Sequence, residues 1–352
     1  MRAPTGLHLN YVSLAEYQSA RWADVLGVVT FDGSAVAAGP ADGAAGIPCA
    51  HVSTPVLPAW PAAGHVHEVW RCGEPAQSGQ HDAVRFRRTA DMLFGCITIN
   101  EGESARPSPG NPPQSPLQEA TAQAYRQICA ALDAENYPHL LRVWNYLAAI
   151  NRDDHGSERY RQFNRARRRA LRACGRALEG NVPAASALGS PLVSPVVVYF
   201  LAGRTAPTFV ENPRQVSAYH YPRGYGAHRP SFSRATLLRQ KGGLALFISG
   251  TASIVGHRSL HVGDTAAQTR EILTNIEALL AEANRVARVA HFELGALACK
   301  VYVRRPSDLP LVQAELDGAL GKAAPVVYLQ ADICRQDLLV EIEAAAMHPR
   351  AA

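Results

Sequence analysis

Two halves of the chain show the same order of expected strands and helices, and this repeat limits the possible folds more than any other feature of the sequence. In the second half, apolar residues that recur every three or four positions predict an amphipathic helix from Ile272 to Val286. One strand precedes this helix, and a strand, a short helix and two further strands follow it. In chain order, these other segments are GLALFISGTASIVG, HFELGALACKVYVR, LPLVQAELDGAL, APVVYLQADI and LLVEIEAAA.

The first half repeats this order from Met92 to Pro222. Its segments are MLFGCITIN, PLQEATAQAYRQICAAL, HLLRVWNYLAAI, SERYRQFNRARRRALRAC, PLVSPVVVYFLAG and RQVSAYHYP. Because the match rests on element order and not on residue identity, chance similarity between two such units is the alternative. The sequence predicts an α+β fold of two tandem units, residues 1–225 and 226–352, with mixed sheets packed on helices and a site between the units.

The composition is that of a globular protein with enough apolar residues for two cores. The chain has 352 residues, of which 47% are hydrophobic and 18% are charged. No apolar run reaches the roughly 18 residues of a membrane span, and the N-terminus lacks the apolar core of a secretory signal. We therefore expect a cytoplasmic protein that does not act at a membrane. The net charge of +5 suits an anionic small molecule or a nucleic acid equally.

The sequence gives no support for a metal or an organic cofactor. Seven cysteines are scattered without CxxC spacing, which argues against a disulfide framework or a thiolate zinc site. The pairs His65-x-His67 and His257-x-x-x-His261 have no obvious third ligand nearby. The motifs GxGxxG, GxSxG and HExxH are absent. We expect no metal and no cofactor.

Two carboxylates, Glu341 and Glu343, interrupt an apolar strand near the C-terminus. Residues two apart in a strand share one face, so both point the same way, while Val340 and Ile342 point the other way. A carboxylate in such a strand is solvated, paired or used in chemistry. The spacing leaves open which of the two carboxylates would be used.

Positive side chains concentrate in two places. One is a helix whose arginines could form a solvated face, bind phosphates, or turn one or two guanidinium groups inward to clamp a carboxylate. These arginines are Arg159, Arg161, Arg165, Arg167, Arg168, Arg169, Arg172 and Arg176. The other is segment 212–236, which has four arginines, three tyrosines and no acid, and is either a basic surface loop or an anion pocket.

The motifs of the chain together resemble the chorismatase family of the RidA-like superfamily. Four segments of the last 120 or so residues are similar to RidA enamine/imine deaminases: LFISGTASIVG, AAQTREILTNIEALL, KVYVRRPSDLP and LVEIEAAA. Four others resemble chorismatase signatures: WNYL, RYRQFNRARRRAL, NPRQVSAYHYP and PSFSRATLL. The resemblance is greatest to members that form both 3- and 4-hydroxybenzoate. It implies a divergent N-terminal RidA-like unit and a catalytic C-terminal one.

The resemblance also implies roles for single residues. Glu341 falls where the family has its catalytic acid, and Cys334 falls where hydroxybenzoate-forming members carry a cysteine. At Gly250, which ends a buried strand, the missing side chain either turns the chain or lets a ligand approach the backbone. The residues expected to bind substrate are Arg161, Arg167, Tyr219, Arg234, Gly250 and Arg304, with the choice between Arg161 and Arg167 open.

The implied activity is cleavage of chorismate to hydroxybenzoate and pyruvate without a cofactor. Chorismate is a dianion with an enol ether, and protonating the methylene carbon of that ether needs a carboxylic acid that stays protonated near neutral pH. A free Glu titrates near ~4.3, and desolvation would raise that pKa toward ~6–7.

Three other functions are open at this stage. One is a RidA-like imine deaminase, which is weakened because AAPVV replaces the arginine that small deaminases carry before the penultimate strand. The others are a chorismate hydrolase that yields a dihydrodiol and a nucleic-acid-binding module built on the arginine helix. We expect no nucleic acid partner, a monomer or small homo-oligomer, and a product used in quinone (ubiquinone) or pigment biosynthesis.

Overall fold

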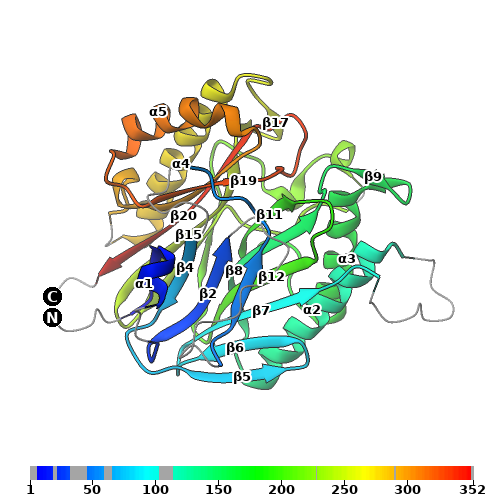
Figure 1. The fold of residues 1–352 in the computed structure, drawn as a ribbon, viewed down its shortest axis with the longest axis vertical. Helices are drawn as coiled ribbons and strands as arrows, with labels where there is room; N and C mark the ends of the chain where they lie inside the picture. The colour runs from blue at the N-terminus through cyan, green and yellow to red at the C-terminus, as the bar shows by residue number, and fades with distance from the viewer. Residues whose placement is uncertain are drawn as a thin grey trace.

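The computed structural model describes residues 6–18, 22–31, 46–58, 66–102, 114–226, 228–288 and 291–349. In these ranges the chain forms three large sheets of four, six and six strands, and its long helices lie on the outside (Figure 1). The α+β class with mixed sheets packed on helices, predicted from the sequence, is confirmed. None of the described helices combines the length and the apolarity that crossing a bilayer requires.

The four-stranded sheet precedes both repeated units. Its strand order is β1-β4-β2-β3, and the short helix α1 (Leu14–Gln18) lies beside β4. The strands are β1 (His8–Val12), β2 (Val25–Phe31), β3 (Cys49–Val52) and β4 (Val66–Arg71). The repeat gave no sign of this sheet, because all its strands come before Met92, where the repeat begins.

The first repeated unit is a six-stranded sheet in the order β11-β8-β12-β7-β6-β5. Helices α2 (Pro116–Glu135) and α3 (Arg159–Ala173) pack on one face, and a two-stranded ribbon leads into α3. The strands of the sheet are β5 (Gln77–His81), β6 (Val84–Arg88), β7 (Met92–Ile99), β8 (His139–Ala148), β11 (Ala184–Ser190) and β12 (Val196–Gly203). The ribbon consists of β9 (Asp153–Asp154) and β10 (Ser157–Glu158).

The second unit is a six-stranded sheet in the order β13-β14-β15-β20-β18-β19, with α4 (Thr265–Ala287) and α5 (Leu309–Leu320) on its outer face. Asp264 caps α4 by accepting the backbone N–H of Ala267. The strands of the sheet are β13 (Thr208–Val210), β14 (Ala235–Gln240), β15 (Gly243–Ala252), β18 (Ala298–Val303), β19 (Val326–Gln330) and β20 (Val340–Pro349). A separate ribbon pairs β16 (Ile254–Val255) with β17 (Arg258–Ser259).

The two six-stranded sheets share one topology. Strands β11, β8, β12, β7, β6 and β5 take the positions that β19, β18, β20, β15, β14 and β13 take in the second sheet. The pairs β8–β11 and β18–β19 are parallel, whereas β8–β12 and β18–β20 are antiparallel. This equal order confirms the tandem duplication that the sequence predicts.

Two of the expected correspondences within the repeat are wrong. The sequence predicts that residues 191–203 correspond to β19 and that residues 214–222 correspond to β20. In the structure, β11 is the counterpart of β19, and β12 is the counterpart of β20. Strand β11, AASALGS, is made mostly of small residues, which give a weak strand signal. Residues 214–222 contain no strand and instead form the single 3₁₀ turn η1 (Ala218–His220).

The second sheet begins before the expected boundary between the units. Strand β13 pairs with β14 in antiparallel register, so backbone hydrogen bonds of this sheet extend back to Thr208. The division into residues 1–225 and 226–352 stays a prediction.

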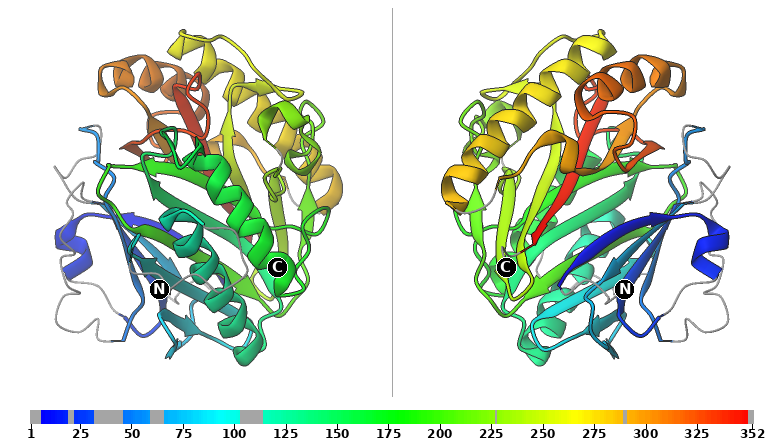
Figure 2. Two further views of the ribbon diagram at one scale, coloured as in Figure 1. Left: turned by 90° about the vertical axis from the view of Figure 1, so that its right-hand side faces the viewer. Right: turned by 90° about the vertical axis from the view of Figure 1, so that its left-hand side faces the viewer.

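A shared core lies where the three sheets face one another, and the helices of the two units lie on opposite outer sides of it (Figure 2). Trp70 of β4 contributes to this core from the four-stranded sheet. Its ring centroid lies 5.7 Å from that of Trp144 on β8 and 6.1 Å from that of Phe247 on β15. Side chains of all three sheets therefore meet in one interior, and the buried charges described below lie there.

Candidate active site

A cavity of about 450 Å³ opens where the two repeated units meet. The first unit contributes the ribbon and the start of α3, and the second contributes β15, β20 and the segment 334–337. The connection between the units closes another side. Five of the residues predicted for the site line this cavity: Arg161, Arg234, Gly250, Cys334 and Glu341.

Glu341 reaches the cavity beside a bulge in the neighbouring strand. The register between β15 and β20 shifts between Ile248 and Thr251, so Ser249 and Gly250 bulge opposite β20. A Cβ atom added to Gly250 would lie 1.9 Å from Oε1 of Glu341. The Glu341 carboxyl group therefore occupies the space that a side chain at position 250 would need.

Burial changes the protonation of Glu341. The side chain is 3% exposed, and desolvation, helped by the negative charge of Glu343, raises the pKa of its carboxyl group to about 8. The guanidinium groups of Arg142, Arg234 and Arg304 oppose this rise. Most Glu341 side chains are thus protonated at neutral pH and can donate a proton.

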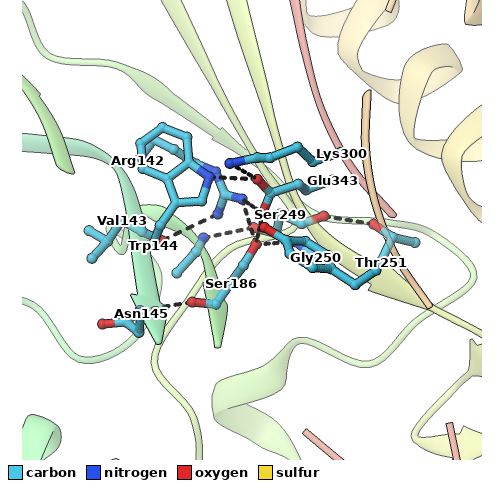
Figure 3. Close-up of polar contacts among 12 residues, drawn as sticks. Arg142, Val143, Trp144, Asn145, Ser186, Ser249, Gly250, Thr251, Lys300 and Glu343 are labelled. Carbon is cyan, nitrogen blue, oxygen red and sulfur yellow. Dashed lines mark hydrogen bonds and ion pairs between the residues drawn. The ribbon is translucent and has the colours of Figure 1, made fainter. Parts of the chain in front are cut away.

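Glu343 lies on the same face of β20 as Glu341, two residues further along the strand, and is buried in a set of donors (Figure 3). Its Oε1 accepts from Nζ of Lys300 at 2.8 Å and from Nε1 of Trp144 at 2.7 Å. Its Oε2 accepts from Nη2 of Arg142 at 2.7 Å and from Oγ of Ser186 at 2.6 Å. Burial alone would raise the pKa of Glu343, but Lys300 and Arg142 outweigh it and hold that pKa below its ordinary value.

Lys300 connects this set to the four-stranded sheet. Its Nζ pairs with Glu68 of β4 at 2.5 Å and donates to the hydroxyl of Tyr199 at 2.6 Å. Burial would lower the pKa of Lys300, yet the charges of Glu343 and Glu68 raise it instead. The lysine therefore stays charged, and the three sheets share one buried ionic network.

The network also touches the bulge beside Glu341. The backbone N–H of Gly250 donates to Oγ of Ser186 at 3.0 Å, and Ser186 in turn donates to Glu343. The two glutamates of β20 thus differ in environment: Glu341 faces the cavity as a neutral acid, and Glu343 lies in the core as an anion. This geometry distinguishes the two carboxylates that the sequence could not.

Two arginines lining the cavity keep unused donors. Nη2 of Arg234 donates to the carbonyl of Val216 and to the hydroxyl of Tyr221, each at 2.8 Å, while its Nε is buried without a hydrogen-bond partner among the described residues. The Cζ of Arg335 lies 4.2 Å from the ring centroid of Tyr225, and its Nη2 is likewise buried without a partner in the described part of the chain. The two guanidinium groups place positive charge in the wall of the cavity, which favours an anion there.

Arg161 and Cys334 complete the predicted residues found here. The Arg161 side chain is half exposed at the rim, with its Nε 3.4 Å from Glu158. Desolvation, with a further contribution from Glu341, raises the pKa of the Cys334 thiol to about 12. Cys334 is therefore a neutral thiol in this wall and not a thiolate nucleophile.

Three predicted site residues do not line the cavity. Arg167 is buried on another side of α3 and lines a second cavity. Tyr219 is buried in η1 and does not line the cavity, whereas Tyr221, two residues later, does. Arg304 donates to the carbonyls of Leu338 and Arg335 and so braces the loop that carries Cys334.

Sequence reasoning missed several residues that line the cavity. Arg335 lines the cavity and directly follows Cys334, so its position next to a predicted site residue could have identified it. Tyr221 and Tyr225 lie in segment 212–236, for which the sequence allowed an anion pocket. The 3₁₀ turn η1, after which Tyr221 and not Tyr219 lines the cavity, has no clear sequence signature. The other missed lining residues include Asn151, Asp153, Glu158, Tyr160 and Phe232.

No group of three His, Cys, Asp or Glu side chains in the described ranges is arranged to hold a metal ion. His65, one of the histidines considered from the sequence, lies outside those ranges.

Comparisons with known proteins agree with the fold. The family described as "Chorismatase FkbO/Hyg5-like, N-terminal" matches residues 68–202. A 3-hydroxybenzoate synthase of Streptomyces hygroscopicus is 36% identical over 82% of this chain and 83% of its own length. A chorismatase of Streptomyces rapamycinicus is 38% identical over 78% of this chain and 80% of its own length.

A solved structure extends the match to nearly the whole chain. A crystal structure of a chorismatase superposes with a TM-score of 0.85 at 32% sequence identity, and the match covers 97% of this chain and 99% of the other. A sequence identity above 30%, over more than two thirds of both chains, establishes that these proteins share a common ancestor. The chain belongs to the chorismatase family.

Proposed function

We propose that this chain is an enzyme that cleaves chorismate to hydroxybenzoate and pyruvate. The observation that carries the proposal is Glu341, an acid with a pKa of about 8 in a cavity that also holds the unused donors of Arg234 and Arg335. The 36% identity to a 3-hydroxybenzoate synthase supports it. 3-Hydroxybenzoate is the expected product, and 4-hydroxybenzoate is expected beside it.

The arginines would hold the two carboxylates of chorismate. A guanidinium group donates charge-assisted hydrogen bonds to a carboxylate, and Nε of Arg234 and Nη2 of Arg335 each have a donor without a partner among the described residues. Arg161 at the rim would attract the dianion as it enters. The hydroxyl of Tyr221, which Arg234 already contacts, would keep that guanidinium in position.

Glu341 would act as the general acid. Its proton goes to the methylene carbon of the enol ether, which leaves an oxocarbenium ion on the side chain and a carboxylate on Glu341. Pyruvate then leaves with the ether oxygen as the C3–O bond breaks, while the oxygen of the neighbouring C4 hydroxyl bonds to C3 to form an epoxide, and the proton of that hydroxyl can restore the Glu341 acid. The epoxide then isomerises to the aromatic ring: breaking its C4–O bond gives 3-hydroxybenzoate, and breaking its C3–O bond gives 4-hydroxybenzoate. Hydroxybenzoate and pyruvate together contain all the atoms of chorismate, so this route consumes no water.

Cys334 would determine how the intermediate collapses. Hydrolysis to a dihydrodiol consumes one water, so a wall that excludes water from the ring favours the aromatic product. The neutral, weakly polar thiol of Cys334 lies in that wall close enough to Glu341 to be affected by its charge. Arg304 would support this role by holding the loop in place.

The test is to incubate the purified protein with chorismate and to measure both products. Pyruvate is followed with lactate dehydrogenase and NADH, and the aromatic products are separated by chromatography. Equal amounts of pyruvate and hydroxybenzoates are expected. Pyruvate accompanied by a dihydrodiol would indicate a hydrolase, and turnover of an enamine generated from serine or threonine without any pyruvate from chorismate would indicate a deaminase.

A further inference from the structure

A second cavity, of about 320 Å³, lies in the first unit between α3, the start of β8 and the segment 206–209. Its walls are largely apolar and include Leu140, Val143, Leu171 and Phe209. Arg167, Arg176 and His139 add positive or potentially positive groups, and none of the described residues that line it is an aspartate or glutamate. The cavity therefore combines an apolar body with basic groups.

Arg167 is the unusual member of this lining. It is only 4% exposed, and no carboxylate of the described residues forms an ion pair with it. Its Nη2 donates to the carbonyl of Ser231 at 2.6 Å, and its Cζ lies 5.4 Å from the ring centroid of Phe163. By contrast, Arg159, the other buried arginine of α3, pairs with Asp154. Burying a charge without a counter-charge is unfavourable, and the neutral groups around Arg167 leave its charge for an anion in the cavity to balance.

Arg176 places a second guanidinium group in the wall of the same cavity. Its Nη1 donates to the carbonyl of Pro138 at 3.1 Å, and its Nη2 pairs with Asp133. Because Arg176 already has Asp133 as its counter-charge and Arg167 has none, the cavity suits a ligand with one negative charge better than a dianion.

The size of the cavity limits the rest of the ligand. Pockets for small molecules span about 300–1,000 Å³, so this cavity lies at the small end of that range. Apolar walls that include Phe209 suit a single ring. We propose that the second cavity is a binding site for a small aromatic monocarboxylate, with its carboxylate on Arg167 and its ring among the apolar walls.

The site adjoins the candidate active site through one short segment. Pro230 and Phe232 line the first cavity, whereas Ser231 between them lines the second and is held by Arg167. A ligand bound to Arg167 would therefore contact the back of the active-site wall. The hydroxybenzoates of the proposed reaction belong to this ligand class, but the site itself is inferred independently of that reaction.

The test is calorimetric titration of the full-length protein with benzoate, which needs no turnover and so does not depend on the proposed activity. An Arg335→Met background reduces binding in the first cavity. In that background, Arg167→Met should weaken benzoate binding about 10- to 100-fold, because a hydrogen-bonded charge pair is lost. The matched control is Arg169→Met, which changes an exposed arginine of the same helix and should leave the affinity unchanged.

A second variant keeps the test decisive if Arg167→Met does not fold. Ala177 is exposed at the edge of the second cavity, so Ala177→Trp should fill the opening and abolish benzoate binding while Arg167 stays in place. Failure of benzoate to bind the Arg335→Met protein would overturn the proposal. Unchanged affinity in a folded Ala177→Trp variant would overturn it as well.

Discussion

Glu341 and Glu343 lie two residues apart on one strand and are both 3% exposed, yet the pKa of one carboxyl group is raised and the pKa of the other is lowered. Glu343 has a cation at each oxygen, Lys300 and Arg142, and its pKa is lowered. Glu341 lines the cavity, and desolvation with the charge of Glu343 raises its pKa to about 8. Keeping one carboxylate ionised thus helps to keep its neighbour protonated.

The acid role of Glu341 predicts a specific loss of chemistry. Glu341→Gln keeps the shape of the side chain but removes the proton that is donated, so kcat for pyruvate release should fall by about 10²- to 10⁴-fold. Glu277→Gln, on the exposed face of α4, is the matched control and should keep full activity. Activity of Glu341→Gln within a few-fold of the parent protein would remove Glu341 from the mechanism.

The raised pKa predicts the shape of the pH profile. Because the protonated form of Glu341 is the active one, kcat/KM should be constant below the pKa of about 8 and fall about tenfold per pH unit above it. The profile is measured by pyruvate release at saturating and subsaturating chorismate. A rate that rises through this range would mean that an ionised group, not a neutral acid, limits the reaction.

The same pKa predicts that Glu341 lowers the stability of the fold at neutral pH. The folded state keeps a proton that the unfolded state releases above about pH 4.5, so the contribution of Glu341 to stability falls as pH rises toward the folded pKa of about 8. The Glu341→Gln variant lacks this term. Its free energy of unfolding, relative to that of the parent, should therefore increase by about 3 kcal/mol between about pH 5 and pH 8 in denaturant titrations.

The donor left unused on Arg335 predicts a binding defect. Arg335→Lys keeps the charge but loses the planar fork, so KM for chorismate should rise about 10- to 100-fold with a smaller change in kcat. Arg305→Lys, at an exposed position nearby in the fold of the second unit, serves as the control. Equal KM values for the two variants would argue against a contact between Arg335 and the substrate.

The wall role of Cys334 predicts a change of product. Cys334→Ala opens space beside Glu341 and should shift the products from hydroxybenzoate toward the dihydrodiol, since a water can then reach the intermediate. Pyruvate release should continue, which separates this effect from a loss of the acid. Chromatography that finds the hydroxybenzoate pattern unchanged would show that the thiol does not direct the outcome.

The limits of sequence reasoning can be traced to particular residues. The repeat predicted the two similar sheets because their strands and helices carry strong periodic signals, but strand β11, built from small residues, carries almost none. Arg161 and Arg167 illustrate a missed opportunity: six residues on a helix correspond to a rotation of about 240°, so the two side chains could not share one cavity. Lys300 and Glu68 could not be linked to Glu343, because only the tertiary fold brings them together.

The coupling between the two glutamates can be tested without removing the acid itself. In Glu343→Gln the negative charge is lost while Arg142 remains, so the pKa of Glu341 should fall and the alkaline limb of the pH profile should move to lower pH. The double variant Arg142→Met, Glu343→Gln removes one charge of each sign, and Lys300 keeps Glu68 as its partner. Its alkaline limb should return toward that of the parent protein. Packing damage would lower the maximal rate of both variants, but it would not shift the alkaline limb in the single variant and restore it in the double variant. An alkaline limb of Glu343→Gln that stays at the pH of the parent protein would therefore refute the coupling.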